Sequence, residues 1–243
     1  MPADLPRSEP SRFAPSHDEV LTELANARNY NAWLFDRGKA RLGDRVLDVG
    51  AGIGTFTELA AAQAGSVAAL EPDEAFASYL RERFRDRSGI EVVQADVTEL
   101  DVAARAGTFD SIICFNVLEH VGDDEVALRT FHELLAPGGC VLLLVPAHEW
   151  LSSPFDRAVG HERRYTAAPM RALLARTGFV ADDLRYVNPV GALGWLVSMR
   201  LRGRRELPRG QVRAFDRLVP FLRPLDALRL PFGQSLWVVA RKL

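Results

Sequence analysis

The stretch RVLDVGAGIG, residues 45–54, decides the fold of this chain. Its apolar first half, residues 45–49, is typical of a buried strand, and glycines follow at positions 50, 52 and 54. A helical pattern begins directly afterwards at Thr55. A glycine-rich turn between a strand and a helix lets the backbone approach a ligand closely, and the start of the helix favours negative charge. The stretch therefore indicates a ligand-binding turn, although a purely structural tight turn would use the same glycines.

Further apolar runs follow this first strand, and helical patterns separate them. The runs cover residues 66–70, 90–95, 109–115 and 140–145, and two later ones cover 180–187 and 235–241. The first runs are continuously apolar rather than alternating, which is typical of parallel strands that are covered on both faces. The sequence therefore predicts an α/β fold with a doubly wound sheet.

Two acidic residues end the strands next to the glycine turn. Glu71 follows the second strand, 21 residues after Gly50, and Asp96 follows the third. A carboxylate at the first position can accept both hydroxyl groups of a ribose. A carboxylate at the next strand end can accept the amino group of an adenine. Since the carboxyl ends of parallel strands share one edge of the sheet, the three features predict a nucleoside-binding site there.

The main alternative for the glycine turn is an NAD-dependent dehydrogenase. Its fingerprint is G-x-G-x-x-G, whereas this chain has G-x-G-x-G with Thr55 at the sixth position. That alternative also leaves Asp96 and the Pro137-Gly138-Gly139 turn without a role.

The conjunction of motifs resembles the class I S-adenosylmethionine-dependent methyltransferases. The motifs are VLDVGAGIG at 46–54, Glu71, Ala95-Asp96, NVLEHV at 116–121 and LAPGG at 135–139. The resemblance covers roughly residues 20–187 and 234–243. It implies a Rossmann-like sheet of seven strands, in which the last strand is antiparallel and lies between the fifth and sixth.

The resemblance also implies how S-adenosylmethionine is bound. Glu71 would bind the ribose and Asp96 the adenine, and the glycine turn would lie along the methionine end of the cofactor. Asp48 would support that turn or meet the amino group of the cofactor, and residues 17–42 would form a lid helix over it. The implied cofactor-binding residues are Tyr30, Asp48, Gly50, Ala51, Gly52, Gly54, Glu71, Pro72, Asp96, Val97, Asn116, Val117, Leu118 and His120.

The segment after the fifth strand, residues 147–166, is the candidate acceptor side. It contains Gly160-His161-Glu162-Arg163-Arg164-Tyr165, which is similar to an element of one bacterial branch of these enzymes. His161 is the candidate general base, because a histidine ordinarily titrates near pH 6.5; a hydrogen bond to the loop is the alternative. Arg164 can clamp an anionic acceptor or pair with a nearby acid, and Tyr165 can donate to the acceptor or pack.

No metal site is expected. Cys114 and Cys140 lie in apolar runs, which argues against a disulfide framework or a cysteine-rich zinc site. The other histidines, His17, His132 and His148, have no acid or cysteine partners at ligand spacing.

The net charge of −2 hides a basic segment. Residues 200–229 carry nine arginines and three acids, a net charge of +6, so the rest of the chain carries −8. This region belongs to an insertion, residues 189–232, which we interpret as a helical cap over the acceptor pocket. A peripheral membrane or lipid-linked acceptor and a homodimer contact are the other interpretations. Nucleic acid is a poor fit, because aromatic residues do not interleave with the arginines.

Length and composition indicate one globular domain. The 243 residues are 48% hydrophobic, and no apolar run approaches the roughly 18 residues of a membrane span. Residues 1–16 are expected to be a disordered leader without a secretory signal, and residues 17–243 one methyltransferase domain. A cytoplasmic location is expected.

The function predicted from these features is methyl transfer to an oxygen or nitrogen of a small-molecule acceptor. Two alternatives remain: methylation of a carboxylate or amine of a peptide or protein, and a non-methylating, cyclase-like scaffold that keeps the cofactor.

Overall fold

The computed structural model describes residues 22–202 and 209–243. The predicted leader, the first residues of the predicted lid helix and positions 203–208 of the insertion lie outside these ranges.

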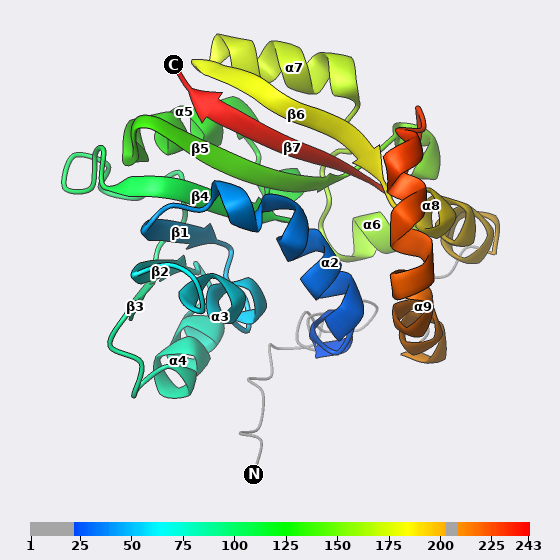
Figure 1. The fold of residues 1–243 in the computed structure, drawn as a ribbon, viewed down its shortest axis with the longest axis horizontal. Helices are drawn as coiled ribbons and strands as arrows, with labels where there is room; N and C mark the ends of the chain where they lie inside the picture. Colours follow the sequence, from blue (N-terminus) through cyan, green and yellow to red (C-terminus); the bar gives the residue numbers. More distant parts are fainter. Residues whose placement is uncertain (1–21, 203–208) are drawn as a thin grey trace.

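A seven-stranded sheet forms the centre of the molecule, in the order β3-β2-β1-β4-β5-β7-β6 (Figure 1). Neighbouring strands from β3 to β5 are parallel, and β7 is antiparallel to both β5 and β6. This confirms the predicted Rossmann-like sheet and its inserted last strand. The strands are β1 (Arg45–Val49), β2 (Ser66–Leu70), β3 (Ile90–Val93), β4 (Phe109–Phe115), β5 (Leu135–Pro146), β6 (Phe179–Val187) and β7 (Ser235–Lys242).

Helices cover both faces of the sheet, which explains why its central strands are mostly apolar. On one face, Leu47 and Cys114 belong to a core formed with α5 (Asp124–Leu134) and α7 (Ala167–Arg176). On the other, Val46 and Ile113 belong to a core formed with α2 (Arg28–Gly38) and α3 (Thr55–Ala61). Successive strand residues therefore enter different cores. A smaller cluster of buried hydrophobic residues packs α4 (Glu74–Arg83) against β2 and β3.

The predicted lid helix is interrupted. Residues 22–25 are helical, and the helix is interrupted at Asn26 and Ala27. Helix α2 follows, and a 3₁₀ turn covers Lys39–Arg41. The break has a local cause, because the side chain of Asn31 donates to the Leu24 carbonyl at 2.8 Å. A side-chain hydrogen bond to a backbone carbonyl competes with the backbone hydrogen bonds that would continue the helix.

The insertion is helical, as expected for a cap. It comprises α8 (Pro189–Trp195), a π-helical turn (Leu196–Leu201), α9 (Arg209–Leu222) and a 3₁₀ segment (Arg223–Leu228). Helix α9 runs beside α2 (Figure 1). Tyr30 packs edge-on against Phe215 with ring centroids 6.0 Å apart, and the Tyr30 N–H donates to the Asp216 carboxylate at 2.9 Å. The lid and the cap therefore form one packed unit.

Within the described ranges, no helix combines the length and the apolar character needed to span a bilayer.

A buried ion pair fastens α2 to the end of the cap. Arg37 bonds the carboxylate of Asp226, whose side chain is only 4% exposed. The other carboxylate oxygen of Asp226 accepts the N–H of Asn188 at 3.1 Å. Asp226 thus joins α2, the start of α8 and the 3₁₀ segment.

Asp226→Ala is expected to lower the free energy of unfolding by about 3 kcal/mol, because it leaves the Arg37 guanidinium buried without its counter-charge. Asp36→Ala is the matched control: it removes the exposed Lys39–Asp36 pair and is expected to cost under about 1 kcal/mol. Urea denaturation of both variants measures the difference. Equal losses would show that Asp226 does not fasten the cap.

Candidate functional site

The glycine turn after β1 depends on residues without side chains. Gly50 has a φ of 67° and Gly54 a φ of 82°, both in the left-handed region that favours glycine. A Cβ atom at Gly50 would collide with the side chain of Val117, and one at Gly54 would lie 2.6 Å from the Phe84 ring. The turn therefore packs its backbone directly against two neighbouring segments.

Glu71 ties the glycine turn to the end of β2. One carboxylate oxygen of Glu71 accepts the Gly52 N–H at 2.8 Å, and the other accepts the Asp73 N–H at 3.1 Å. The side chain is buried, and this burial raises the pKa of Glu71 despite the two bonds. A ligand hydroxyl could therefore donate a hydrogen bond to the Glu71 carboxylate, whose position is already fixed.

Asp48 lies below the same turn. Its carboxylate accepts the hydroxyl of Thr57 at 2.6 Å, and the residue is 3% exposed. Burial, opposed by the bond from Thr57 and assisted by the charge of the neighbouring Glu71, raises the pKa of Asp48 to about 7. Two buried carboxyl groups close together make this edge of the sheet favourable for a cationic group.

A cavity of about 400 Å³ opens beside the turn, at the carboxyl ends of β1 to β4. Asp96 stands in its wall, where one carboxylate oxygen accepts both the N–H (2.8 Å) and the hydroxyl (2.6 Å) of Thr98. Six of the residues expected to bind the cofactor line this cavity: Gly50, Pro72, Asp96, Val97, Val117 and His120. Val121 and Val126 also line it and were not predicted.

The other expected cofactor residues surround this cavity or lie away from it. Asn116 directly follows β4 with a φ of 55°, unusual for a residue with a side chain, and its N–H bonds the Leu144 carbonyl. Leu118 is fully buried in the core. Tyr30 contacts Trp33 and Phe215 rather than the cavity wall. The structure therefore brings Tyr30 to the cap, and its expected role as a cofactor contact stays a prediction.

A buried aspartate organises the predicted acceptor segment. Asp156, in the short helix α6 (Pro154–Ala158), is 3% exposed. One of its carboxylate oxygens accepts the N–H and the hydroxyl of Ser153, and the other lies 3.0 Å from His161 Nδ1 and bonds Arg164. Although burial opposes ionisation, the bond with His161 and the charge of Arg164 lower the pKa of Asp156 to about 2. His161 and Arg164 therefore face a permanent negative charge.

The structure shows the ion-pair alternative for Arg164. Its side chain is 3% exposed, bonds Asp156 and the Ala147 carbonyl, and lies over the Trp195 ring. Tyr165 is likewise buried, and its hydroxyl donates to Leu118 or to Asp124. Burial raises the pKa of Tyr165. Both side chains hold the loop against the domain.

Glu119 was not predicted as a site residue, although it lies within the NVLEHV motif. It is fully buried, neither carboxylate oxygen has a hydrogen-bond partner in the described ranges, and burial raises its pKa to about 8. One of its oxygens lies 3.9 Å from His161 Nε2, and the His120 ring meets the His161 ring edge-on at 4.8 Å. Ligand atoms of these three residues lie within 4.8 Å of one another, a grouping that can hold a metal ion and that the sequence did not suggest.

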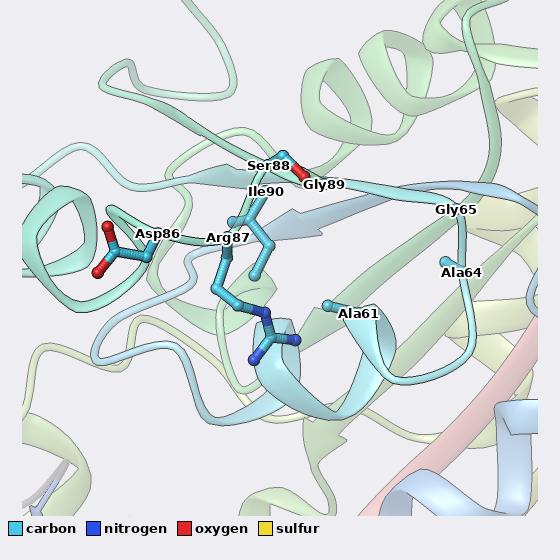
Figure 2. Close-up of a pocket in the computed structure, with 8 residues that line it drawn as sticks. All are labelled: Ala61, Ala64, Gly65, Asp86, Arg87, Ser88, Gly89 and Ile90. Atoms are coloured by element: carbon cyan, nitrogen blue, oxygen red, sulfur yellow. The ribbon is translucent and has the colours of Figure 1, made fainter.

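A second hollow, of about 190 Å³, lies at the opposite edge of the sheet, near the starts of β2 and β3 (Figure 2). Small residues such as Ala61 and Gly89 form much of its wall, together with Arg87 and Asp86. It contains none of the residues expected to bind a cofactor or an acceptor.

The fold and the first cavity together define a Rossmann-like domain with a nucleoside-binding edge. A family model described as "Methyltransferase domain" matches residues 17–184, and the chain belongs to this family. The chain is accordingly a class I S-adenosylmethionine-dependent methyltransferase.

Individual relatives agree with this assignment. The ubiquinone biosynthesis O-methyltransferase of Pseudomonas aeruginosa (strain LESB58) is 34% identical over 134 residues, which are 55% of this chain and 54% of that protein. The protein of the same name from Escherichia coli O6:H1 is 30% identical over 181 residues, 71% of this chain and 68% of that protein. The chain thus spans about half the length of the first relative and about two thirds of the second.

The solved structures agree on the fold. An S-adenosylmethionine-dependent methyltransferase from Mesorhizobium loti superposes with a TM-score of 0.61 at 21% identity, covering 88% of this chain and 100% of that one.

S-adenosylmethionine is the cofactor of this family, and the residues present fit it. The carboxylate of Asp96 lines the cavity, and so does Gly50, where a Cβ atom would collide with the cavity-lining Val117. The buried carboxyl groups of Asp48 and Glu71 suit a ligand that carries positive charge.

Asp48→Asn is expected to weaken the pH dependence of stability. Because the folded-state pKa of about 7 exceeds the ordinary value of 3.8, the stabilisation by protonated Asp48 is complete below about pH 4 and is lost as the pH rises through 7. The loss is at most about 1.4 kcal/mol per pH unit. Asparagine keeps an acceptor for the hydrogen bond from Thr57 but carries no charge. The free energy of unfolding of the variant should therefore rise relative to that of the wild type as the pH increases from 4 to 7.

Urea denaturation from pH 4 to pH 7.5 measures this difference. Asp86→Asn, on the surface near the second hollow, is the control for the same chemical change. A constant stability difference between Asp48→Asn and the wild type across this range would contradict the raised pKa of Asp48.

Proposed function

We propose that this protein transfers the methyl group of S-adenosylmethionine to a hydroxyl oxygen of a small-molecule acceptor. The observation that carries the proposal is the Asp156–His161 pair, which provides a proton acceptor for a hydroxyl group; the His161 ring contacts His120, which lines the cavity. The names of the two relatives, both O-methyltransferases of ubiquinone biosynthesis, support oxygen as the methylated atom.

On the cofactor side, the chain binds and orients. Glu71 would accept the ribose hydroxyls, since its carboxylate is already held by Gly52 and Asp73. Asp96 would accept the adenine amino group, and Asp48 would attract the methionine ammonium group through the turn. When bound, S-adenosylmethionine supplies a methyl group on a positively charged sulfur, which leaves that methyl group open to in-line attack by an oxygen.

On the acceptor side, His161 would take the hydroxyl proton. Asp156 is ionised, so a proton on His161 Nδ1 is the arrangement its hydrogen bond favours. Nε2 then carries the lone pair. Nε2 would accept the proton of the acceptor hydroxyl as its oxygen is methylated, and S-adenosylmethionine would supply the methyl group and leave as S-adenosylhomocysteine. General-base assistance of this kind contributes roughly 10²–10⁴-fold in rate.

Arg164 and Tyr165 would act as positioning residues in this scheme. Arg164 keeps Asp156 charged and fixes its orientation, and Tyr165 fastens the loop to residues Leu118 and Asp124. Neither side chain is free to meet an acceptor without breaking its present contacts. The contribution of Arg164 is therefore through Asp156 and His161.

His161→Ala is expected to lower the rate of methyl transfer at least about tenfold, equivalent to about 1.4 kcal/mol of barrier, because the proton acceptor is lost. The affinity for S-adenosylmethionine should be unchanged, since Glu71, Asp96 and the glycine turn are intact. His132→Ala, a histidine packed on Phe179 away from the cavity, is the control. Formation of S-adenosylhomocysteine with a panel of phenols and catechols measures the rate, and calorimetry measures cofactor affinity.

Three results would count against this proposal. Unchanged turnover of His161→Ala at saturating acceptor would remove His161 from the reaction. Intact-mass analysis that finds the added methyl group on a peptide or protein, and on no small molecule, would favour the protein-methylating alternative. Tight cofactor binding without any methylated product would favour the non-methylating scaffold.

A further inference from the structure

The cap carries an unusual concentration of exposed apolar side chains. In the described part of the chain, six of the ten large hydrophobic residues with exposed side chains belong to residues 189–232. Phe221 is 78% exposed and Leu201 is 70% exposed. We call these six residues the apolar cap face: Leu193, Val197, Leu201, Leu218, Phe221 and Leu228.

The apolar cap face draws on two stretches of the cap, residues 193–201 and 218–228, and a hydrogen bond links the elements that carry them. The hydroxyl of Ser198, in the π-helical turn, bonds the side chain of Gln211 in α9 at 3.0 Å. Figure 1 shows α8 and α9 at the same end of the molecule, next to the start of β7. Within α9, Leu218 and Phe221 are exposed, whereas Val219 is 1% exposed and faces inward. Helix α9 therefore presents one apolar side to the protein and a second one to solvent.

Arginines border this face. Arg202, Arg213, Arg217, Arg223 and Arg229 are all exposed, and none of them pairs with a carboxylate among the described residues. Arg213 and Arg217 are four residues apart, so they lie on one side of α9. Long arginine side chains can keep their charge in a polar layer while their stems cover apolar surface.

Two acids of the same segment, Asp216 and Asp226, lie in the described ranges, and both contact α2. Asp216 accepts hydrogen bonds from Tyr30 and Asn29 of α2, and Asp226 pairs with Arg37. Both acids therefore serve the contact with the lid. The outer surface that the structure describes on this segment is left with positive charge and exposed apolar groups.

We propose that the apolar cap face docks this protein on the surface of an anionic phospholipid bilayer. Such a surface offers negative headgroups to the arginines and an acyl boundary to side chains such as Phe221 and Leu218. A nucleic acid would match the arginines alone. A two-fold dimer through this face would bring the same arginines of two copies together, which like charges disfavour.

The inference is independent of the proposed function, because no residue of the apolar cap face lines the cofactor cavity. Loss of membrane binding can therefore be measured without an acceptor.

Co-sedimentation of the full chain with vesicles tests the proposal. The wild type is expected to bind phosphatidylcholine vesicles that contain one third phosphatidylglycerol, to bind pure phosphatidylcholine much more weakly, and to be released in part by 0.5 M NaCl. Leu218→Gln/Phe221→Gln and Arg213→Gln/Arg217→Gln are each expected to lower the partition coefficient at least about tenfold.

The controls separate this surface from general charge and from misfolding. Arg87→Gln/Arg171→Gln removes the same two charges from exposed positions elsewhere and should bind like the wild type. Every variant should keep the wild-type affinity for S-adenosylmethionine. Equal binding of neutral and anionic vesicles, or wild-type binding by both cap variants, would overturn the proposal. So would a wild-type dimer in light scattering that Leu218→Gln/Phe221→Gln converts to a monomer.

Discussion

The hydrogen bond between the Gly52 N–H and the buried carboxylate of Glu71 is the constraint on which the site depends. It joins the turn after β1 to the end of β2, and in the same turn Gly50 has a left-handed backbone packed closely against Val117. The cavity, the carboxylate of Asp96 and the NVLEHV segment are then arranged along one edge of the sheet. A parallel sheet makes this arrangement natural, since every strand delivers its carboxyl end to the same side.

Buried carboxyl groups dominate the electrostatics of this edge. Burial raises the pKa of Asp48, Glu71 and Glu119, because the charged carboxylates lose their contact with water. A positively charged ligand would offset this cost of ionisation. Asp156 is the contrasting case, because His161 and Arg164 keep it ionised. Asp48 and Asp156 are therefore shifted in opposite directions, although both carboxyl groups are buried.

Much of this was predictable from the sequence, and the remainder depended on contacts between distant segments. The order of strands, the acids at the ends of β2 and β3 and the helical insertion follow from local patterns and from the family resemblance. The approach of Glu119 to His161 joins residues 42 positions apart, and only the folded loop brings them within 3.9 Å. The break at Asn26 depends on the side chain of Asn31, and the inward direction of Asp216 and Asp226 depends on α2. Residue type alone gave no sign of these three features.

Calorimetric titration with S-adenosylmethionine and with NAD, on the wild type and on Glu71→Gln, tests the central claim most directly. The wild type should bind S-adenosylmethionine and give no heat with NAD. Glu71→Gln should bind the former at least about tenfold more weakly, because it loses a charged acceptor for the ribose hydroxyls, a hydrogen bond of about 1.5–3 kcal/mol. Binding of NAD in place of S-adenosylmethionine, or an unchanged affinity of Glu71→Gln, would contradict a methyl-donor site at this edge of the sheet.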